Sequence, residues 1–316
     1  MPRVFVTREL PVDPRAILSE ELGATADGEV HVDVFDQPRA PTRDELFAGA
    51  AGADAVVSLL SERIDGAFLD ATPTVRIVAN FAVGYDNIDV AACTERGVWV
   101  SNTPGVLTEA TADLAFTLLL AVARRVREGE RLVRSGNFDG WSPTMLLGTE
   151  LSGKVLGIYG AGRIGRAVAR RGEAFGMQVL ERGRGRGVDF DELIERSDVI
   201  SIHAPSNDET RHAFDERVFA RMKNTALLIN TARGAIVDEG ALARALEDGQ
   251  IGGAGLDVYE DEPRVHPGLI GRDDVVLLPH LGSATHGTRR RMAETALRNV
   301  AAVLCGERPP DAVNAV

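Results

Sequence analysis

The chain has 316 residues, of which 44% are hydrophobic and 26% charged, values that suit a globular protein of one large or two ordinary domains. Its 35 basic and 47 acidic residues give a net charge of −12, which argues against binding to nucleic acid or to an anionic membrane. Two cysteines without a pairing or metal-ligand pattern predict a cytoplasmic protein that binds no metal. The start of the chain resembles a strand more than a signal peptide, and the apolar stretch 114–123 is too short to span a bilayer.

Residues 3–100 alternate short strand-like runs with helical segments, which predicts a parallel sheet covered on both faces. The strands are expected at residues 4–6, 30–35, 55–60, 76–79 and 98–100. The helices between them are expected at residues 13–22, 43–49 and 65–71. This stretch contains no glycine-rich phosphate turn, so we do not expect it to bind a nucleotide.

The turn cluster 101–105 indicates a crossing into a second domain, and an apolar helix is expected at 108–126. The arginine-rich segment 124–134 then leads to Trp141. Its pattern has two interpretations, an amphipathic arm that contacts another subunit or a helix with a solvated face. Both interpretations stay open at this point.

A second alternation of strands and helices follows, and its first strand leads directly into a glycine-rich turn. Its strands are expected at residues 155–159, 177–180, 199–202, 226–230, 253–256 and 275–278. This order predicts a Rossmann domain over residues 101–284. A last helix, expected at 289–304, returns the chain to the first domain, which therefore comprises 1–100 and 285–316. The expected fold is thus α/β with two doubly wound parallel-sheet domains.

The turn itself is Gly160-Ala161-Gly162-Arg163-Ile164-Gly165, a Gly-x-Gly-x-x-Gly motif between a strand and a helix. We expect Gly160 to form the tight turn, Gly162 to let the backbone approach a pyrophosphate, and Gly165 to let the helix pack on the strand. The free N–H groups at the start of the helix would bind the phosphates. An ordinary strand–helix turn is the alternative, because glycine-rich turns also occur without a ligand.

The end of the second strand of this domain indicates which nucleotide binds. An acidic residue about 20 positions past the glycine motif usually binds the ribose hydroxyls of NAD, but here that position is Gly183. Arg184 and Arg186 follow, and guanidinium groups suit a 2′-phosphate. We therefore expect NADP(H), with NAD(H) as the alternative if Glu181 serves as the acid. The arginines have a second interpretation as a solvated basic loop.

Polar side chains follow three later strands, where a Rossmann sheet presents strand ends to its ligand. Arg233 follows the first, Asp257 and Glu262 the second, and His280 the third. A histidine at a strand end is by itself more often structural than catalytic. An arginine, a histidine and carboxylates at successive strand ends of one cofactor domain instead indicate a catalytic site.

With these motifs in order, the sequence resembles the D-isomer-specific 2-hydroxyacid dehydrogenase family over nearly its whole length. The matching stretches, besides the glycine motif, are residues 80–89, 102–104, 151–154, 231–234, 255–258 and 279–283. Within the family the chain is most similar to the glyoxylate/hydroxypyruvate reductases, which also carry arginines after the second strand. The resemblance implies NADPH-dependent reduction of a small 2-oxo acid to a D-2-hydroxy acid.

The resemblance also implies a role for individual residues. Arg233 would bind the carboxylate and carbonyl of the 2-oxo acid, His280 would be the acid/base, and Glu262 would pair with His280. A carboxylate beside a histidine favours its charged form, and the fork of an arginine matches a carboxylate. Substrate contacts are expected from Val83, Gly84, Arg233, His280 and Ser283. Cofactor contacts are expected from Gly160, Gly162, Arg163, Ile164, Gly165, Gly183, Arg184, Arg186, His203, Pro205, Thr231, Ala232, Asp257 and Gly282.

The family architecture implies a flavodoxin-like substrate domain, a cleft between the domains, and a homodimer formed through the nucleotide domain and the arm at 124–141. Other activities of the family, on D-3-phosphoglycerate, D-lactate or a phosphonate, are the first alternatives. The chain ends at Val316 without the regulatory domain of many phosphoglycerate dehydrogenases. A dinucleotide-sensing binding protein that resembles the family's corepressors is an alternative of another class.

Overall fold

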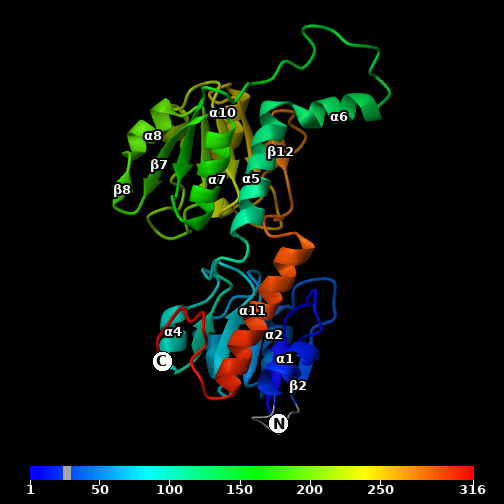
Figure 1. Cartoon of the computed structure of the whole chain (residues 1–316), viewed down its shortest axis with the longest axis vertical. Helices are drawn as coiled ribbons and strands as arrows, with labels where there is room; N and C mark the ends of the chain where they lie inside the picture. The colour runs from blue at the N-terminus through cyan, green and yellow to red at the C-terminus, as the bar shows by residue number, and fades with distance from the viewer. Residues whose placement is uncertain (24–29) are drawn as a thin grey trace. The chain divides into compact units, whose positions relative to one another are not determined.

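The computed structural model describes residues 1–23 and 30–316, and the chain divides into two compact units (Figure 1). The first unit comprises Met1–Leu107 with Ser283–Val316, and the second comprises Thr108–Gly282. Residues 101–107 belong to the first unit because Ser101 ends strand β5 (Trp99–Ser101) and the Thr103 N–H donates to the Ala82 carbonyl over 2.8 Å. Each unit is built on its own sheet, which confirms the expected α/β fold with two domains.

The sheet of the first unit has, among the described residues, five parallel strands in the order β2-β1-β3-β4-β5, which is the flavodoxin-like order. The other strands of this sheet are β1 (Arg3–Val6), β2 (His31–Val34), β3 (Ala55–Ser58) and β4 (Ile77–Asn80). Each of the five predicted strands is present, with bounds that differ by one or two residues.

Helices cover both faces of this sheet because successive side chains of a strand point to opposite faces. Val4 and Val6 of β1 lie in one buried cluster with α1 (Pro14–Leu22) and α11 (His286–Leu304). Phe5 lies in the cluster on the other face, which is covered by α2 (Arg43–Ala50), α3 (Gly66–Ala71) and α4 (Val90–Glu95). α11 belongs to the first unit, and it begins three residues earlier than the expected 289 because Thr285 caps it.

The sheet of the second unit has the order β12-β11-β10-β9-β6-β7-β8 in the described chain. Its strands are β6 (Val155–Tyr159), β7 (Gln178–Gly183), β8 (Arg186–Gly187), β9 (Val199–Ile202), β10 (Leu227–Asn230), β11 (Gly253–Leu256) and β12 (Val275–Leu277). Apart from β8, the strands are parallel, and the strand order reverses between β6 and β9. A ligand of a doubly wound sheet binds at the carboxyl ends of the strands at such a switch point.

Two layers of helices cover this second sheet. α5 (Thr108–Ala123) and α7 (Arg163–Ala174) form one layer and lie side by side in Figure 1. The other layer consists of α8 (Phe190–Arg196), α9 (Glu216–Phe219) and α10 (Glu239–Glu247). Strand residues such as Leu156, Ile158 and Ile200 have no exposed surface, as expected for a parallel sheet covered on both faces.

Two local features differ from the sequence prediction. The strand β8 was not predicted; it pairs antiparallel with the end of β7 and adds a seventh strand to the six expected. The predicted helix 108–126 ends at Ala123, because Arg125 adopts a left-handed conformation with φ 51° and α6 (Val126–Arg134) begins after it. Figure 1 shows α6 and the segment that follows extending away from the body of the second unit.

Candidate functional site

The glycine motif joins β6 to α7 at the switch point, and the local geometry explains why glycine stands at each of its three positions. Gly160 has φ +103°, and a Cβ there would collide with the backbone of Ala204. A Cβ on Gly165 would collide with the Gly160 carbonyl, so the close packing of helix on strand requires glycine. A Cβ on Gly162 would have no atom within 4 Å, so the backbone is open to a ligand there. These observations match the three expected uses of glycine.

The start of α7 has the properties of an anion site. Gly162 is the N-cap and makes no side-chain hydrogen bond to the helix, and the first turn carries no acidic residue. Arg163 is exposed and Ile164 half-buried at the start of this helix of 12 residues. The N–H groups of the first turn and the helix dipole therefore favour a negatively charged group, as a pyrophosphate requires.

The end of β7 places Gly183 and the two arginines beside this turn. The carbonyl of Arg182 accepts from the N–H groups of Gly160 and Ala161 over 2.9 and 3.0 Å. β7 extends to Gly183, so Glu181 lies two residues before its end. The Arg186 guanidinium donates to the Ala161 carbonyl, and Arg184 is exposed in the turn between β7 and β8. The hairpin that the sequence did not predict thus carries both arginines.

His203 follows β9 and contacts the opposite side of the glycine turn. Its backbone N–H donates to the Tyr159 carbonyl over 2.7 Å, and its Nε2 lies 2.8 Å from the Ser201 hydroxyl. Burial lowers the pKa of His203 to about 3, so this side chain stays neutral at physiological pH. Pro205 is exposed two residues later. The backbone of His203 thus lies against the turn, and its neutral imidazole adds no charge there.

The end of β10 holds Arg233 through a buried amide. Asn230 has no exposed surface; its amide nitrogen donates to the Arg233 carbonyl over 2.9 Å, and its amide oxygen accepts from the Ala232 N–H over 3.0 Å. Between them, the Thr231 hydroxyl is buried and has no hydrogen-bond partner among the described residues. An unpartnered buried hydroxyl and an open glycine backbone at one sheet edge are what a bound polar cofactor would satisfy. The residues present therefore fit a dinucleotide.

Asp257 at the end of β11 organises the turn that carries His280. Its carboxylate has no exposed surface and accepts from the N–H groups of Leu281 and Gly282 over 2.7 and 2.8 Å. Burial raises the pKa of Asp257, and the two N–H groups and the charge of His280 oppose this shift. His280 itself adopts a left-handed conformation with φ 56°, which is uncommon for a residue with a side chain. Asp257 therefore stabilises a strained turn, a role that the sequence did not predict.

His280 and Glu262 form the expected pair. The Nδ1 of His280 lies 2.9 Å from one carboxylate oxygen of Glu262, and the Tyr259 N–H donates to the other over 3.0 Å. Burial raises the pKa of Glu262, but the hydrogen bond and charge of His280, the Tyr259 N–H and the charge of Arg233 outweigh it, so the pKa lies below its ordinary value. Both side chains keep about a third of their surface exposed, with 34% for His280 and 38% for Glu262. The imidazole is thus oriented by a carboxylate and still open to a reactant.

The remaining predicted substrate residues belong to the first unit. The Val83 carbonyl accepts from the Asn102 amide over 2.7 Å, and the Gly84 carbonyl accepts from the Asn80 amide over 2.8 Å. Because a trans peptide directs its C=O and N–H oppositely, the Asn102 bond also fixes the direction of the Gly84 N–H. Ser283 begins the return segment of this unit. The structure thus brings Arg233, Glu262 and His280 together in one unit and assigns Val83, Gly84 and Ser283 to the other.

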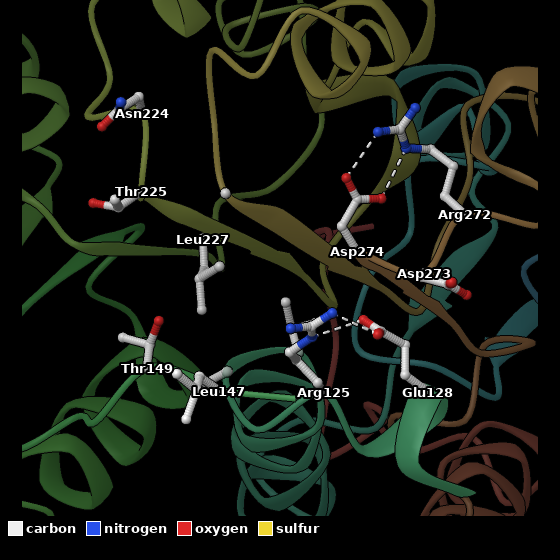
Figure 2. A pocket seen from close by; sticks show the side chains of 14 residues that line it. Arg125, Glu128, Leu147, Thr149, Asn224, Thr225, Leu227, Arg272, Asp273 and Asp274 are labelled. Carbon is white, nitrogen blue, oxygen red and sulfur yellow. Dashed lines mark hydrogen bonds and ion pairs between the residues drawn. The ribbon is translucent and has the colours of Figure 1, made fainter. Parts of the chain in front are cut away.

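A pocket of about 670 Å³ lies at the opposite end of the second unit's sheet (Figure 2). Thr225, Gly252 and Asp274, which line it, precede β10, β11 and β12, so the pocket adjoins the amino ends of these strands. Its arginines are paired: the Arg125 guanidinium with Glu128, at 2.9 and 2.6 Å, and Arg272 with Asp274 at 2.8 Å. This pocket shares no residue with the predicted site.

Among residues 1–23 and 30–316 there is no cluster of three or more histidine, cysteine, aspartate or glutamate side chains that could hold a metal ion. Within the same residues, every helix is too short or too polar to cross a membrane.

Comparison with known proteins places the chain in a family. Residues 116–282 match the D-isomer specific 2-hydroxyacid dehydrogenase, NAD binding domain. A glyoxylate reductase from Thermococcus litoralis is 45% identical over 328 aligned positions, which cover 99% of this chain and 97% of that protein. The crystal structure of the TT0316 protein from Thermus thermophilus is similar with a TM-score of 0.92 and 43% identity, and the match covers 99% of this chain and 100% of that one.

A third similar protein has been solved with ligands. It is the NADPH-dependent glyoxylate/hydroxypyruvate reductase from Sinorhizobium meliloti in complex with NADP and malonate. Its TM-score is 0.83 at 34% identity, and the match covers 99% of this chain and 96% of that one. The glycine motif, the strand-end residues and these matches agree, and the chain therefore belongs to the D-isomer specific 2-hydroxyacid dehydrogenase family, which makes it an oxidoreductase of small hydroxy or oxo acids with a nucleotide cofactor.

Proposed function

We propose that the protein reduces small 2-oxo acids, glyoxylate and hydroxypyruvate, to D-2-hydroxy acids with NADPH as the preferred reductant. The observation that carries the proposal is the His280–Glu262 pair at 2.9 Å, with the left-handed turn of His280 held by Asp257. The names of the similar proteins, glyoxylate reductase and glyoxylate/hydroxypyruvate reductase, support the choice of substrate.

The residues divide the chemistry as follows. A nicotinamide cofactor bound at the glycine motif would supply the hydride for the carbonyl carbon of the 2-oxo acid. Arg233 binds the substrate carboxylate and carbonyl with its planar fork and stabilises the negative charge that develops on the carbonyl oxygen. His280 donates the proton from Nε2 to that oxygen, while Glu262 accepts from Nδ1–H and stabilises the charged imidazole. The product is an alcohol, and His280 recovers its proton from solvent.

The proposal includes the other predicted contacts. Val83 and Gly84 bind the substrate carboxylate through their N–H groups, and Ser283 is a further substrate contact. Asp257, Thr231, Ala232 and Gly282 contribute to the nicotinamide side of the cofactor site. The unpartnered Thr231 hydroxyl supports this assignment most directly.

The end of β7 supports the proposed preference for NADPH. Gly183 offers no carboxylate to the ribose hydroxyls, and β7 does not end early enough to place Glu181 there. Arg184 is exposed beside the turn, and the Arg186 guanidinium lies next to Ala161 of the glycine motif. Gly183 lacks the carboxylate that would bind the ribose hydroxyls of NAD, and two guanidinium groups lie close to it. Each guanidinium can bind a 2′-phosphate through two N–H groups.

The experiment that tests the acid/base role is His280→Ala. We expect this variant to lose reduction of glyoxylate while it still binds NADPH, measured by quenching of the nicotinamide fluorescence. His31→Ala is the matched control, because His31 lies on β2 of the first unit with 52% of its side chain exposed. Turnover by His280→Ala at the wild-type rate would remove His280 as the proton donor.

We also propose that the protein forms a homodimer in the cytoplasm, with the arm around 124–141 at the contact. No residue of α6 is buried, and four apolar side chains along the arm are exposed. They are Val126 at 54%, Val133 at 62%, Phe138 at 48% and Trp141 at 81% exposure. A run of exposed apolar side chains on a projecting segment is typical of a contact surface.

The dimer is tested by light scattering after size exclusion. The double variant Phe138→Asp with Trp141→Asp should have half the mass of the wild-type protein, because charges in a desolvated contact oppose association. Ile270→Asp, a similar change at an apolar residue that is 61% exposed outside the arm, should not change the mass. A monomeric wild-type protein would overturn this part of the proposal.

A further inference from the structure

Glu239 is a buried carboxylate at the start of α10 that the proposed mechanism does not use. Only 5% of its surface is exposed. The N-cap of this helix is Asp238, whose side chain accepts from the Ala241 N–H over 2.8 Å, so the position of Glu239 is fixed by a capped helix. A buried carboxylate is costly unless its oxygens accept hydrogen bonds. The hydrogen bonds of Glu239 therefore identify the part of the chain that it fixes in place.

The two carboxylate oxygens of Glu239 accept from two backbone amides that belong to one segment. One oxygen accepts from the Glu260 N–H over 2.6 Å, and the other accepts from the His266 N–H over 3.0 Å. These amides lie on either side of Glu262 in the sequence. One carboxylate thus binds both ends of segment 260–266.

The segment needs this support because little of it is buried. Residues 261–264 are exposed. Besides the contacts of Glu262 with His280 and the Tyr259 N–H, the Arg264 N–H donates to the Asp261 carbonyl over 2.8 Å, and the Arg264 guanidinium pairs with the Asp261 carboxylate. Packing therefore does not fix the middle of the segment. Glu262 is at this exposed middle, and its distance of 2.9 Å from His280 depends on where the segment lies.

We propose that Glu239 is a positioning residue for the acid/base pair: its buried carboxylate holds both ends of segment 260–266 and so sets Glu262 against His280. The inference rests on the proposed function, because that function assigns Glu262 its role of orienting His280. Glu239 acts through the backbone of the segment and does not touch the reacting atoms. It is one layer further from the chemistry than Glu262, and supporting groups of this kind determine how accurately a catalytic side chain is placed.

The first test compares Glu239→Gln with Glu247→Gln, the same substitution at an exposed position of the same helix. Glutamine keeps the size of glutamate but has one acceptor oxygen instead of two, so one amide loses its partner. For Glu239→Gln we expect kcat to fall by about 10- to 100-fold, because small displacements of catalytic groups have effects of this size. We also expect the high-pH limb of the rate profile to move to lower pH, because a displaced carboxylate favours the charged imidazole less. The dissociation constant of Glu239→Gln for NADPH should match that of the wild type, and Glu247→Gln should match the wild type in kcat and pH profile.

A second pair of variants removes one donor instead of the acceptor and covers the case in which Glu239→Gln does not fold. His266 has φ −57° and ψ 128°, values that proline adopts without strain. His266→Pro deletes the N–H that Glu239 accepts, and His266→Ala removes the same imidazole but keeps the N–H. We expect kcat of His266→Pro to lie below that of His266→Ala and its rate profile to shift as in Glu239→Gln.

A double-mutant cycle shows whether Glu239 acts through Glu262. With Glu262 already replaced by Gln, the further change Glu239→Gln should lower kcat by less than twofold, because the positioned group is gone. An equal loss in both backgrounds, or a lower melting temperature with unchanged kcat and pH profile, would overturn the inference. Failure of the proposed function appears differently, as wild-type reduction of glyoxylate by His280→Ala.

Discussion

Replacing Gly183 by Asp and Arg184 by Ala should shift the cofactor preference from NADPH towards NADH. Gly183 has no left-handed backbone, and a Cβ there would lie 3.2 Å from Nε of Arg186 and 3.4 Å from Cβ of Ala161. A side chain therefore fits after a small shift of a flexible arginine. The new carboxylate repels a 2′-phosphate, accepts from ribose hydroxyls and can pair with Arg186. The second change removes the exposed guanidinium.

The size of the shift follows from one charge-assisted contact. A hydrogen bond to a charged group contributes about 1–3 kcal/mol, so the ratio of the NADPH and NADH dissociation constants should change about 5- to 150-fold. Arg184 is exposed, and solvent screening places the single change Arg184→Ala at the lower end of this range. The double change should shift the ratio more than Arg184→Ala alone, because the carboxylate introduced in place of Gly183 would repel the 2′-phosphate in addition to the loss of Arg184's attraction.

The assay is a fluorescence titration of each variant with NADPH and NADH at one fixed salt concentration, since phosphate contacts are screened by salt. Arg196→Ala, which removes an exposed arginine from α8 in the same unit, serves as the control and should leave the ratio unchanged. An unchanged ratio in the double variant would show that the 2′-phosphate does not bind at the end of β7. The assignment of Gly183, Arg184 and Arg186 would then be wrong.

Three further predictions concern single side chains. Arg233→Lys should lower kcat/KM for glyoxylate by about 100- to 1000-fold, because an ammonium group cannot bind carboxylate and carbonyl together as the planar fork does; steady-state kinetics within tenfold of wild type would contradict this. Glu262 has a lowered pKa in the folded protein, whereas an unfolded glutamate has a pKa of about 4.3. Its pairing with His280 therefore stabilises the fold at pH values above the unfolded pKa. This stabilisation disappears as the pH falls through the lower pKa of the folded state. Urea unfolding should accordingly show a stability difference between wild type and Glu262→Gln at pH 6 that shrinks as the pH is lowered below the unfolded pKa, whereas a difference independent of pH would refute the assignment. Cys93 is buried and its pKa is raised to about 12, while Cys305 is exposed, so a thiol reagent at neutral pH should modify Cys305 in the folded protein and Cys93 only after unfolding.

The sequence predicts the sheets and the glycine turn well because their signals are local. A strand buried on both faces needs a continuous apolar run, and a tight turn under a helix needs glycine at fixed spacing. The strand-end positions of Arg233, Asp257 and His280 follow from the same runs. Their convergence at one edge is a property of any parallel sheet whose carboxyl ends meet there.

Other features depend on contacts that no local pattern contains. β8 consists of Arg186 and Gly187, residues with little preference for strands, and forms only because the end of β7 offers a partner. Arg125 breaks the predicted long helix with a left-handed conformation that glycine or asparagine would have indicated.

The supporting carboxylates are hidden from the sequence for a similar reason. Asp257 accepts from amides 24 and 25 residues away, and Glu239 from amides 21 and 27 residues away. A carboxylate at a strand end or in a first helical turn is ordinary, and only the folded chain shows which distant amides each one binds. The sequence therefore indicates the proposed catalytic residues more readily than the groups proposed to position them.

The most direct test is the oxidation of NADPH, followed by the ultraviolet absorbance of the reduced nicotinamide, with glyoxylate and hydroxypyruvate as substrates. Pyruvate and phosphohydroxypyruvate, and NADH as the second reductant, complete the comparison. Rapid oxidation of NADPH with the first two acids, faster than with NADH and absent in His280→Ala, is the predicted result. If none of these acids is reduced with either nucleotide, the protein is not a 2-oxo acid reductase, and the dinucleotide-binding interpretation replaces it.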